Sequence, residues 1–500
     1  MNKILTAIEA LASSNPKKIA FIGQNNRGEH QSMSYLELLR EVDINAHVFR
    51  AMKAKCIALK AENSLDWVVL DLAAMKAKVA LVPVPTFFTA KQVEHTLRKS
   101  GADVLVGDWK SDKEAITSLR GLPVYMRQVN EKSDVIPQTC KITFTSGSTG
   151  DPKGVCLSTQ NIERVAMALA NSMEADRDTH LSLLPLSTLL ENITSVYVPL
   201  LLGITARIYK PETLGLNGSS QLDFERFAHA LAQFQPSSMV ITPSILIALI
   251  QLAQINPELA KSLKFVAVGG ARVAPELINN AHQHGIPAYE GYGLSELASV
   301  VCLNTVDNCK AGTSGRPLEH VEVKISADQE LLVKGNIALG YIGEPYEDEW
   351  FATGDLASVD GDGYITIVGR KKNQIISGFG RNISPEWVES QAQVFAPGCP
   401  FILTGDAQAS LTAIVANYLD IEHKIQRLNQ SLPDYARIKN LFIVSDLDSR
   451  THWFTSNGRP KRAVIESWVS CVHKQYISDP AVTLKTLNIQ AEHKDSRRVI

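Results

Sequence analysis

The chain has 500 residues and a mass of 54.8 kDa, which is too large for one small core and predicts several structural units. Its hydrophobic fraction of 45% and charged fraction of 20% are near globular averages, which excludes disordered and low-complexity chains. With 50 basic and 52 acidic residues, the net charge of -2 provides no overall attraction to nucleic acid or to an anionic membrane.

The N-terminal segment 1–14 has apolar residues at helical spacing, with Glu9 among them. This pattern predicts an amphipathic helix rather than a signal peptide. The most apolar window, residues 196–208, is too short to span a bilayer and contains Pro199 and Gly203. We therefore expect no integral membrane segment and a cytoplasmic protein.

Strands and helices alternate through the first hundred residues. Ser34 with Glu37 and Thr89 with Gln92 match the pattern that caps helices, and Gly101 is a suitable helix end. The expected elements are helices at 34–53, 65–78 and 89–101, and strands at 56–59, 79–84 and 104–106. This alternation predicts a parallel sheet with helices on both faces and ligands at the carboxyl ends of its strands.

The same rhythm returns between residues 224 and 293 and predicts a second α/β subdomain. Short strands with glycine turns between 312 and 366 indicate an antiparallel piece, and helices mix with strands after Arg370. The seven scattered cysteines include no C-x-x-C pair, which indicates a reducing compartment and neither a zinc site nor a disulfide framework. We expect all seven to be buried.

The segment ITFTSGSTGDPKGV, residues 142–155, carries the strongest chemical signal. Its glycines allow the backbone N–H groups to converge on one anion, the hydroxyls add donors, and Lys153 adds a positive charge. The predicted phosphate-binding residues are Thr145, Ser146, Gly147, Ser148, Thr149, Gly150 and Lys153. No Lys follows the second glycine directly, so this is not a G-x-x-x-x-G-K-[ST] loop.

This segment resembles the signature loop of the adenylate-forming superfamily, which includes acyl-CoA synthetases, luciferases and adenylation domains. Further segments follow in the family's order: GGARVAP at 269–275, YEGYGLSE at 289–296, FATGDL at 351–356 and GRKKNQIISGFGRNISPEWVE at 369–389. The resemblance extends from about Tyr35 to Arg462. It implies ATP, Mg²⁺ and coenzyme A as ligands.

The resemblance also implies roles for individual residues. Gly270 and Ala271 would wall the adenine and acyl sites, while Tyr292, with Gly293 beside it, would stack on adenine. Ser295 would bond the α-phosphate. Glu296 would hold Mg²⁺, to which Thr145 is the second expected ligand.

The later segments carry the ribose site and a hinge by the same resemblance. Asp355 would accept hydrogen bonds from both ribose hydroxyls, Arg370 would reach the ribose and Lys372 would sit at the hinge, while Gly378 and Gly380 would line the pantetheine tunnel. The expected fold is α/β: a large N-terminal domain of parallel α/β subdomains with a small antiparallel β piece, then a small mobile α+β domain. The domains would be 1–369 and 374–500, joined by a hinge at 370–373.

Two half-reactions follow from the resemblance: a carboxylate and ATP give acyl-AMP and pyrophosphate, and a thiol then displaces AMP to give a thioester. The apolar segment 183–203 resembles that of long-chain fatty acyl-CoA synthetases, although a buried helix under the active site fits it as well. We predict a fatty acyl-CoA synthetase. A fatty acyl-AMP ligase that loads an acyl carrier protein, and a catalytically weakened binding protein, remain alternatives.

The C-terminal motif departs from the family. Gly-Lys followed three residues later by Arg is usual, and the lysine bridges the acyl carboxylate and the α-phosphate. Here Arg459 occupies the lysine position, and Lys461 lies two residues further on. Arg keeps the charge but is not equivalent to Lys. We predict Arg459 as the catalytic residue, together with Lys153 and Glu296, and keep Lys461 as the alternative.

Overall fold

The computed structural model describes residues 2–109, 114–129, 133–145, 152–173, 179–217, 221–376, 381–406, 408, 410–455, 458–473 and 481–487. It divides into two compact units. Unit 1 comprises Met1–Thr353 with Ala357–Ile367, and unit 2 comprises Gly354–Leu356 with Val368–Ile500. The division lies close to the predicted domain boundary, and the hinge predicted at 370–373 stays a prediction.

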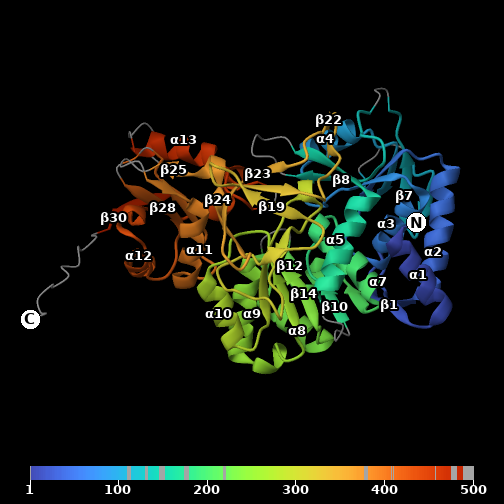
Figure 1. The fold of residues 1–500 in the computed structure, drawn as a ribbon, viewed down its shortest axis with the longest axis horizontal. Helices are drawn as coiled ribbons and strands as arrows, with labels where there is room; N and C mark the ends of the chain where they lie inside the picture. Colours follow the sequence, from blue (N-terminus) through green and yellow to red (C-terminus); the bar gives the residue numbers. More distant parts are fainter. Residues whose placement is uncertain are drawn as a thin grey trace, which may run out of the picture. The chain divides into compact units, whose positions relative to one another are not determined.

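Unit 1 contains two sheets of nine strands (Figure 1). The first sheet has the order β22 (Glu344–Pro345), β21 (Gly340–Tyr341), β9 (Lys153–Ser158), β8 (Thr139–Thr145), β4 (Ala80–Pro83), β3 (Cys56–Lys60), β5 (Val104–Gly107), β7 (Leu122–Met126), β6 (Thr117–Leu119). Its central strands β8, β4, β3 and β5 are parallel, and its outer pairs are antiparallel. The sequence therefore predicted the parallel centre correctly but not the antiparallel margins.

The second sheet has the order β18 (Arg316–Pro317), β17 (Cys302–Leu303), β16 (Ala288–Tyr292), β15 (Phe265–Val268), β14 (Ser238–Ile241), β10 (Thr179–Ser182), β11 (Thr205–Ile208), β1 (Ile19–Gln24), β2 (His30–Ser34). Strand β1 pairs in parallel with β11, with Phe21 opposite Ala206. The N-terminal hairpin of β1 and β2 therefore belongs to the second sheet, whose other strands come from residues 179–317.

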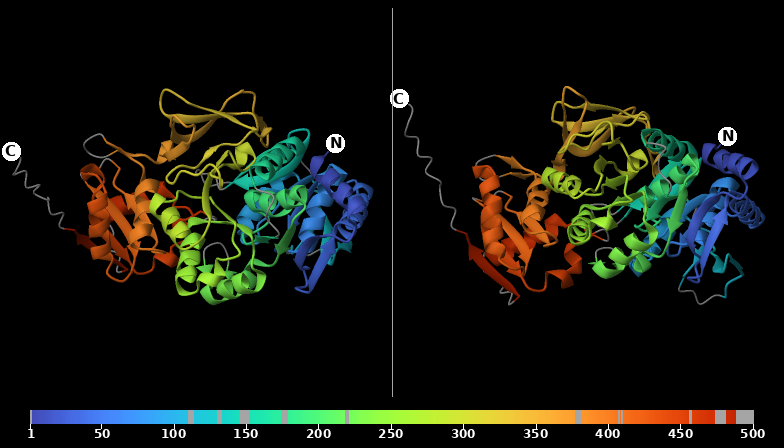
Figure 2. Two further views of the ribbon diagram at one scale, coloured as in Figure 1. Left: turned by 60° about the horizontal axis from the view of Figure 1, so that its bottom comes forward. Right: turned by 90° about the horizontal axis from the view of Figure 1, so that it is seen from below.

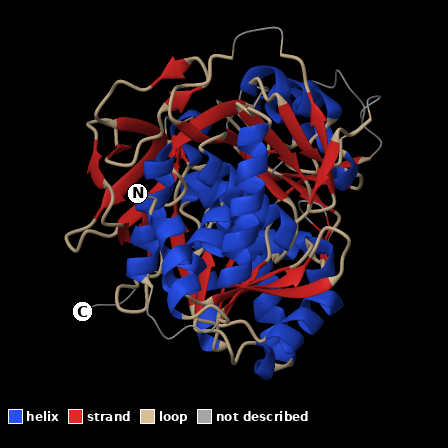
Figure 3. Ribbon diagram, turned by 90° about the vertical axis from the view of Figure 1, so that its right-hand side faces the viewer, coloured by secondary structure: helices blue, strands red, loops and turns tan. Residues whose placement is uncertain are grey.

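Helices cover both sheets and lie between them (Figure 3). They are α1 (Lys3–Ser14), α2 (Tyr35–Ala51), α3 (Leu65–Ala77), α4 (Ala90–Ser100), α5 (Thr159–Ser172), α6 (Leu189–Asn192), α7 (Val198–Leu202), α8 (Phe224–Phe234), α9 (Pro243–Ile255) and α10 (Pro275–Gln283). The capping boxes predicted at Ser34–Glu37 and Thr89–Gln92 both form, and Gly101 ends α4 with a φ of 62°. The predicted amphipathic helix is α1, which lies beside α2 in both views of Figure 2.

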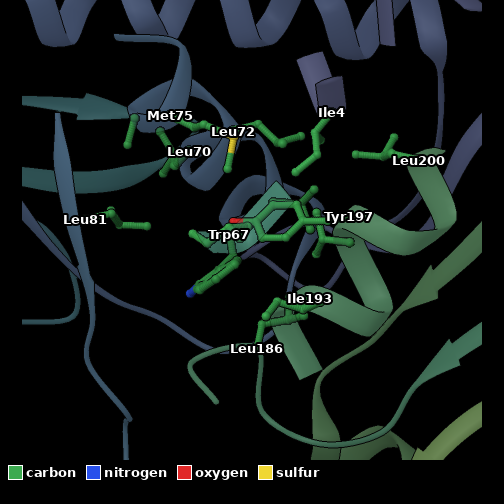
Figure 4. Packing of buried hydrophobic residues seen from close by; sticks show 14 of the residues in the cluster. Ile4, Trp67, Leu70, Leu72, Met75, Leu81, Leu186, Ile193, Tyr197 and Leu200 are labelled. Carbon is green, nitrogen blue, oxygen red and sulfur yellow. The ribbon is translucent and has the colours of Figure 1, made fainter. Parts of the chain in front are cut away.

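The main core of unit 1 contains a closed polar group among apolar side chains. Figure 4 shows Trp67 of α3 beside Tyr197, which ends the π-helical turn Ile193–Tyr197 between α6 and α7. Next to them, the Lys141 ammonium contacts Asp71 Oδ1 at 2.7 Å and the Tyr197 hydroxyl at 2.7 Å, and that hydroxyl donates to Asp71 Oδ2 at 2.6 Å. Asn192 bonds both Lys141 and Asp71. Each charge is therefore compensated inside the core.

An antiparallel sheet follows, in the order β19 (Glu322–Ile325), β20 (Glu330–Lys334), β23 (Phe351–Val359), β24 (Ile365–Arg370), and the division between the units passes through its last two strands. Unit 2 has a mixed sheet of β27 (Phe401–Thr404), β28 (Leu411–Ala416), β29 (Ile438–Val444) and β30 (Val482–Thr486), and the hairpin β25 (Ile375–Ile376) with β26 (Asn382–Ile383). Its helices are α11 (Pro385–Phe395), α12 (Ile421–Ser431) and α13 (Arg462–His473). The predicted α/β class, with its antiparallel piece and C-terminal α+β part, is confirmed.

Two further expectations from the sequence can be compared with the structure. Cys309 is exposed and Cys471 is partly exposed, so burial of all seven cysteines was wrong. Cys309 lies in the turn region after β17, where no second layer covers it. In the part of the chain that the structure describes, no helix is long and apolar enough to cross a membrane.

Candidate active site

The hairpin β8–β9 holds the two ends of the predicted phosphate loop. Thr145, the last residue of β8, pairs with Lys153, the first residue of β9, and its Oγ1 donates to the Lys153 carbonyl at 3.4 Å. The Lys153 side chain is half exposed, and its ammonium lies 3.9 Å from the exposed Glu344 carboxylate. The other predicted loop residues (Ser146, Gly147, Ser148, Thr149, Gly150) lie outside the described residues.

Glu296, the predicted Mg²⁺ ligand, lies on the 3₁₀ turn Ser295–Leu297 just after β16. Its Oε1 accepts a hydrogen bond of 2.7 Å from the Tyr341 hydroxyl, and its carbonyl accepts one of 2.8 Å from Ala338 N. The Lys153 ammonium lies 4.6 Å from the centroid of the Tyr341 ring. Lys153 and Glu296 thus both contact one tyrosine, Tyr341, and Thr145 is the strand partner of Lys153.

Sequence reasoning missed Tyr341. The region around it was identified only as short strands with glycine turns, and Tyr341 is 45 positions from its partner Glu296. The available signal was the pair Gly340–Tyr341 ahead of another glycine, Gly343, which marks a tight hairpin. That signal predicts a turn but says nothing of what the ring contacts.

The turn after Glu296 is strained. Ala298 and Ser299 have φ values of 55° and 103°, which side-chain-bearing residues adopt at a cost of order 1–3 kcal/mol each. A Cβ on Gly293 would lie 1.5 Å from the Ser299 carbonyl oxygen, so only glycine permits this close approach. The same turn holds Ser295 and Glu296 at the carboxyl end of β16, where sheets of this kind bind ligands.

Two predicted adenine-site segments end neighbouring parallel strands. Tyr292 closes β16 and is half-buried against the apolar cluster around Leu297. Gly270 follows β15 with a φ of +85°, and a Cβ there would meet no atom within 4 Å. Gly270 and Ala271 are both exposed. The stacking of Tyr292 on adenine stays a prediction.

Glu290, inside β16, is a second acid of this region that sequence reasoning did not single out. Burial raises the pKa of Glu290 to about 7, against the opposing effects of Ser314 and Arg272. The Ser314 hydroxyl donates to Glu290 Oε1 at 3.0 Å. A charged residue within an otherwise buried strand was the available signal, and it indicates a carboxyl that holds a proton near neutral pH.

Unit 2 brings together the predicted ribose and hinge residues. Asp355 of β23 accepts the Arg370 guanidinium of β24 at 2.9 Å; the Asp355 side chain is 5% exposed and that of Arg370 is 34% exposed. Lys372 lies just beyond β24 in the turn Lys371–Asn373. Partial burial lowers the pKa of Lys372, as do Arg370 and Arg459, while Asp355 opposes them. Gly378 and Gly380 lie outside the described residues.

Arg459 and Lys461 lie in different local structures. Arg459 lies on an exposed turn that is closed by hydrogen bonds between Thr455 N and the Arg459 carbonyl, at 2.8 Å, and between Arg459 N and Thr455 Oγ1, at 3.1 Å. Its charge is close enough to Lys372 to lower that pKa. Lys461 instead leads into α13, and its carbonyl accepts from Ile465 N at 3.2 Å. Arg459 thus lies on an exposed turn and Lys461 at the start of a helix, and the catalytic role predicted for Arg459 stays a prediction.

A partly buried ion pair fixes the base of that turn. Arg462, the first residue of α13, donates to Glu389 Oε2 at 2.8 Å and to Oε1 at 3.1 Å, which ties α13 to α11. Asn373 donates to Glu386 of the same helix at 2.6 Å. The residues that follow β24 and those that precede α13 are therefore anchored to one helix.

The donor set fits an adenine nucleotide with Mg²⁺. Mg²⁺ keeps few protein ligands when phosphates supply the rest; Glu296 offers one carboxylate and Thr145 one hydroxyl. Within the described ranges, no three or more His, Cys, Asp and Glu side chains form a group that could hold a metal ion. The open space at Gly270 suits a ligand that approaches the backbone closely.

Known proteins match this chain over most of its length. The chain is 25% identical over 446 residues to the long-chain-fatty-acid–CoA ligase FadD15 of Mycobacterium bovis, with 72% of each chain covered. It is 26% identical over 491 residues to a 2-succinylbenzoate–CoA ligase of Staphylococcus epidermidis, with 92% of this chain and 97% of the relative covered. The structure of o-succinylbenzoate coenzyme A synthetase from Bacillus subtilis, in complex with ATP and magnesium ion, matches with a TM-score of 0.73 and 20% identity over 92% of this chain and 98% of that chain.

The model of one protein family, described as AMP-binding enzyme, matches residues 8–343, which include the phosphate-loop hairpin, Tyr292, Glu296 and Tyr341. This match covers well over half of the chain and confirms the resemblance that the sequence motifs carried. The chain belongs to the AMP-binding enzyme family.

Proposed function

We propose that this protein is an ATP-dependent acid–thiol ligase that converts a carboxylic acid into an acyl-AMP and then into an acyl-CoA thioester. The observation that carries the proposal is that Lys153 and Glu296 both contact Tyr341, while Thr145 pairs with Lys153 where β8 ends and β9 begins. A hydroxyl, a cation and a carboxylate at one place match the chemistry of a magnesium-bound polyphosphate.

The residues of unit 1 would hold ATP and the acid in reacting positions. Lys153 would neutralise phosphate charge, Ser295 would bond the α-phosphate, and Tyr292 would cover one face of the adenine. Bound Mg²⁺, held by Glu296 and Thr145, would withdraw charge from the phosphate oxygens during attack. Positioning and electrostatic stabilisation would supply most of the rate, without a covalent enzyme intermediate.

The residues of unit 2 would bind the ribose and stabilise charge during the reaction. The two carboxylate oxygens of Asp355 suit the vicinal hydroxyls of ribose, with Arg370 holding the carboxylate in place. Arg459 would stabilise the negative charge that develops between the carboxylate and the α-phosphate. We keep Lys461 as the alternative for this role.

The two half-reactions require different groups at one site, and we propose that residues 374–500 move as a domain about a hinge at 370–373. Lys372→Pro fixes φ at the pivot and should impair thioester formation while sparing acyl-AMP formation. Separate assays of pyrophosphate exchange and of thioester release from preformed acyl-AMP measure the two effects. An equal loss in both assays would refute the hinge.

We propose a fatty acid as the substrate. The segment 183–203 is apolar, and Leu190 approaches the Gly269 backbone, next to the open Gly270. Its single charged residue is Glu191, which is buried and whose Oε1 accepts hydrogen bonds from Leu183 N at 2.9 Å and Ser195 Oγ at 2.8 Å. A chain of methylene groups needs no charged partner in such a wall, and the relative FadD15 is named for long-chain fatty acids.

The second candidate substrate is 2-succinylbenzoate or a similar aromatic acid. It is favoured by the relative of Staphylococcus epidermidis, which aligns along 97% of its length. That substrate has two carboxylates, and the one that is not activated would need a cationic partner. Segment 183–203 contains no Lys or Arg, so the cation would have to come from another part of the chain.

ATP–pyrophosphate exchange with saturated fatty acids of increasing length and with 2-succinylbenzoate tests both candidates in one assay. Thioester analysis with coenzyme A and with a phosphopantetheinylated acyl carrier protein then identifies the acceptor. We expect exchange with fatty acids and transfer to coenzyme A, and no exchange in a folded Glu296→Ala variant. Exchange with 2-succinylbenzoate alone would transfer the assignment to the aromatic class, and binding of ATP without exchange for any acid would indicate a binding protein.

A further inference from the structure

Tyr341 lies on a strand that is fixed directly against the phosphate-loop hairpin. Strand β21 pairs antiparallel with β9, with Tyr341 opposite Val155, and Ile342 N donates to the Gly154 carbonyl at 3.0 Å. Gly340 is required at this place, because a Cβ there would lie 2.4 Å from the Glu344 carbonyl oxygen. The backbone of Tyr341 is therefore held two residues away from Lys153 in register.

The ring of Tyr341 is held as firmly as its backbone. It packs edge-on against Tyr346 at 5.5 Å between centroids, and Tyr346 packs against Phe351 at 5.2 Å. Its exposed face lies under the Lys153 ammonium, 4.6 Å from the centroid, within the range of a cation–π interaction. The ring thus provides a rigid platform for the cation at the end of the phosphate loop.

The hydroxyl of Tyr341 acts on the other charged group of the site. It donates to Glu296 Oε1 at 2.7 Å, and the neighbouring Ala338 N donates to the Glu296 carbonyl. Oε2 of Glu296 has no hydrogen bond to any residue that the structure describes, so this oxygen is available to a cation. Hydrogen bonds of this kind to a metal-ligating carboxylate set its orientation, and their loss typically weakens metal binding 10–100-fold.

We propose that Tyr341 is a positioning residue for the magnesium–nucleotide complex: its hydroxyl orients Glu296 toward the metal, and its ring holds Lys153 beside the phosphates. This inference rests on the proposed function, because it requires that ATP and Mg²⁺ bind at Glu296. It adds one element to that function. A single side chain couples the anionic and cationic ligands of the polyphosphate, so that neither is placed independently of the other.

Two substitutions separate the two parts of the proposal. Tyr341→Phe removes the hydroxyl and keeps the ring, whereas Tyr341→Leu removes both. The probe is Mn²⁺. Electron paramagnetic resonance measures its binding to the full-length protein in the presence of a non-hydrolysable ATP analogue. Calorimetry in EDTA measures the binding of the same analogue without metal. Tyr341→Phe should raise the Mn²⁺ Kd by about 10-fold and leave binding of the metal-free analogue within about 2-fold. Tyr341→Leu should weaken both.

The matched control is Tyr346→Phe, the same substitution in the partner ring, whose hydroxyl lies next to that of Tyr341 but makes no hydrogen bond to Glu296 among the described residues. It should bind Mn²⁺ like the wild type. A double-mutant cycle with Glu296→Gln tests the route: if Tyr341 acts through Glu296, Tyr341→Phe should have no further effect in that background.

Wild-type Mn²⁺ affinity in Tyr341→Phe, or an equal loss in Tyr346→Phe, would overturn the inference. Failure of the proposed function is seen differently. If no acid supports pyrophosphate exchange while Mn²⁺ and nucleotide still bind, the ligase assignment fails. The Mn²⁺-binding measurements on the Tyr341 variants then still decide the role of Tyr341. Wild-type protein that binds no metal–nucleotide complex would refute both.

Discussion

The two ion pairs Lys141–Asp71 and Arg370–Asp355 use charge in opposite ways. In the core of unit 1, Lys141 and Asp71 are 2% and 1% exposed, and Tyr197 and Asn192 complete a closed set of hydrogen bonds around them. In unit 2, Asp355 is buried but Arg370 is 34% exposed, and further cations, Lys372 and Arg459, lie nearby. A closed group can only hold the fold together, whereas an open group with excess positive charge can accept an anionic ligand.

The largest expected effect on stability comes from removing one charge of the buried Lys141–Asp71 pair. Lys141→Met leaves Asp71 as an uncompensated buried charge and should lower the free energy of unfolding by about 3–5 kcal/mol. Urea denaturation followed by tryptophan fluorescence measures this, and Trp67 lies beside the site. The double variant Lys141→Met with Asp71→Leu is the control. It should recover most of the loss, because it removes both charges, and no recovery would show that the group does more than balance charge.

Removing a cation from the open group should affect chemistry and not folding. Arg459→Ala should slow acyl-AMP formation by about 10²–10³-fold, the loss expected for one preorganised charge, with an unchanged unfolding midpoint because the turn is exposed. Pyrophosphate exchange measures the rate. Lys461→Ala is the matched control and should retain most activity; if Lys461→Ala is the inactive variant and Arg459→Ala is not, the assignment of the two residues is reversed.

Glu191 differs from both Asp71 and Asp355, because it is a buried carboxyl with no ion pair among the described residues. Burial raises its pKa from 4.5 to about 7. The folded protein therefore holds a proton that the unfolded chain releases between these pH values, so the stability conferred by protonation is complete below pH 4.5 and is lost as the pH rises through about 7. The loss is about 3 kcal/mol by linkage.

Glu191→Gln should remove this pH dependence. Gln retains an oxygen to accept from Leu183 N and Ser195 Oγ, and it cannot ionise. Urea denaturation of both proteins at several pH values between 4.5 and 8 measures the difference, which should grow in favour of the variant as the pH rises. Parallel stability curves would show that Glu191 does not titrate in this range.

The smallest expected effect concerns the open pair itself. Arg370→Met should lower the free energy of unfolding by only about 1 kcal/mol, because a partly exposed guanidinium gains little from its partner and Asp355 keeps the positive charge of Lys372 nearby. The same variant should weaken nucleotide binding, since Asp355 loses the group that orients it. Urea denaturation and calorimetry with AMP measure the two effects, and a folding loss as large as that of Lys141→Met would remove the distinction between the groups.

The candidate site was predictable wherever one short segment carries its chemistry. Thr145, Lys153, Tyr292, Glu296 and Asp355 were identified from motifs in which neighbouring residues explain one another. Tyr341 was not, because its partner Glu296 is distant in sequence and a tyrosine in a short strand is most often a packing residue. The burial of Glu290 and Glu191 was also not foreseen, since an acid in a sequence is by default expected at the surface.

The sequence by itself determined the local elements and the family. Ser34 with Glu37 and Thr89 with Gln92 start helices because each pair satisfies its own backbone donors, and this needs no distant partner. Only the tertiary structure decided that β1 joins β11 in the second sheet, that Lys141 finds Asp71 in the core, and that Tyr341 joins Lys153 to Glu296. The physical reason is that strand pairing, ion pairing and ring packing each gain their energy from a partner that the chain brings near only when the whole core forms.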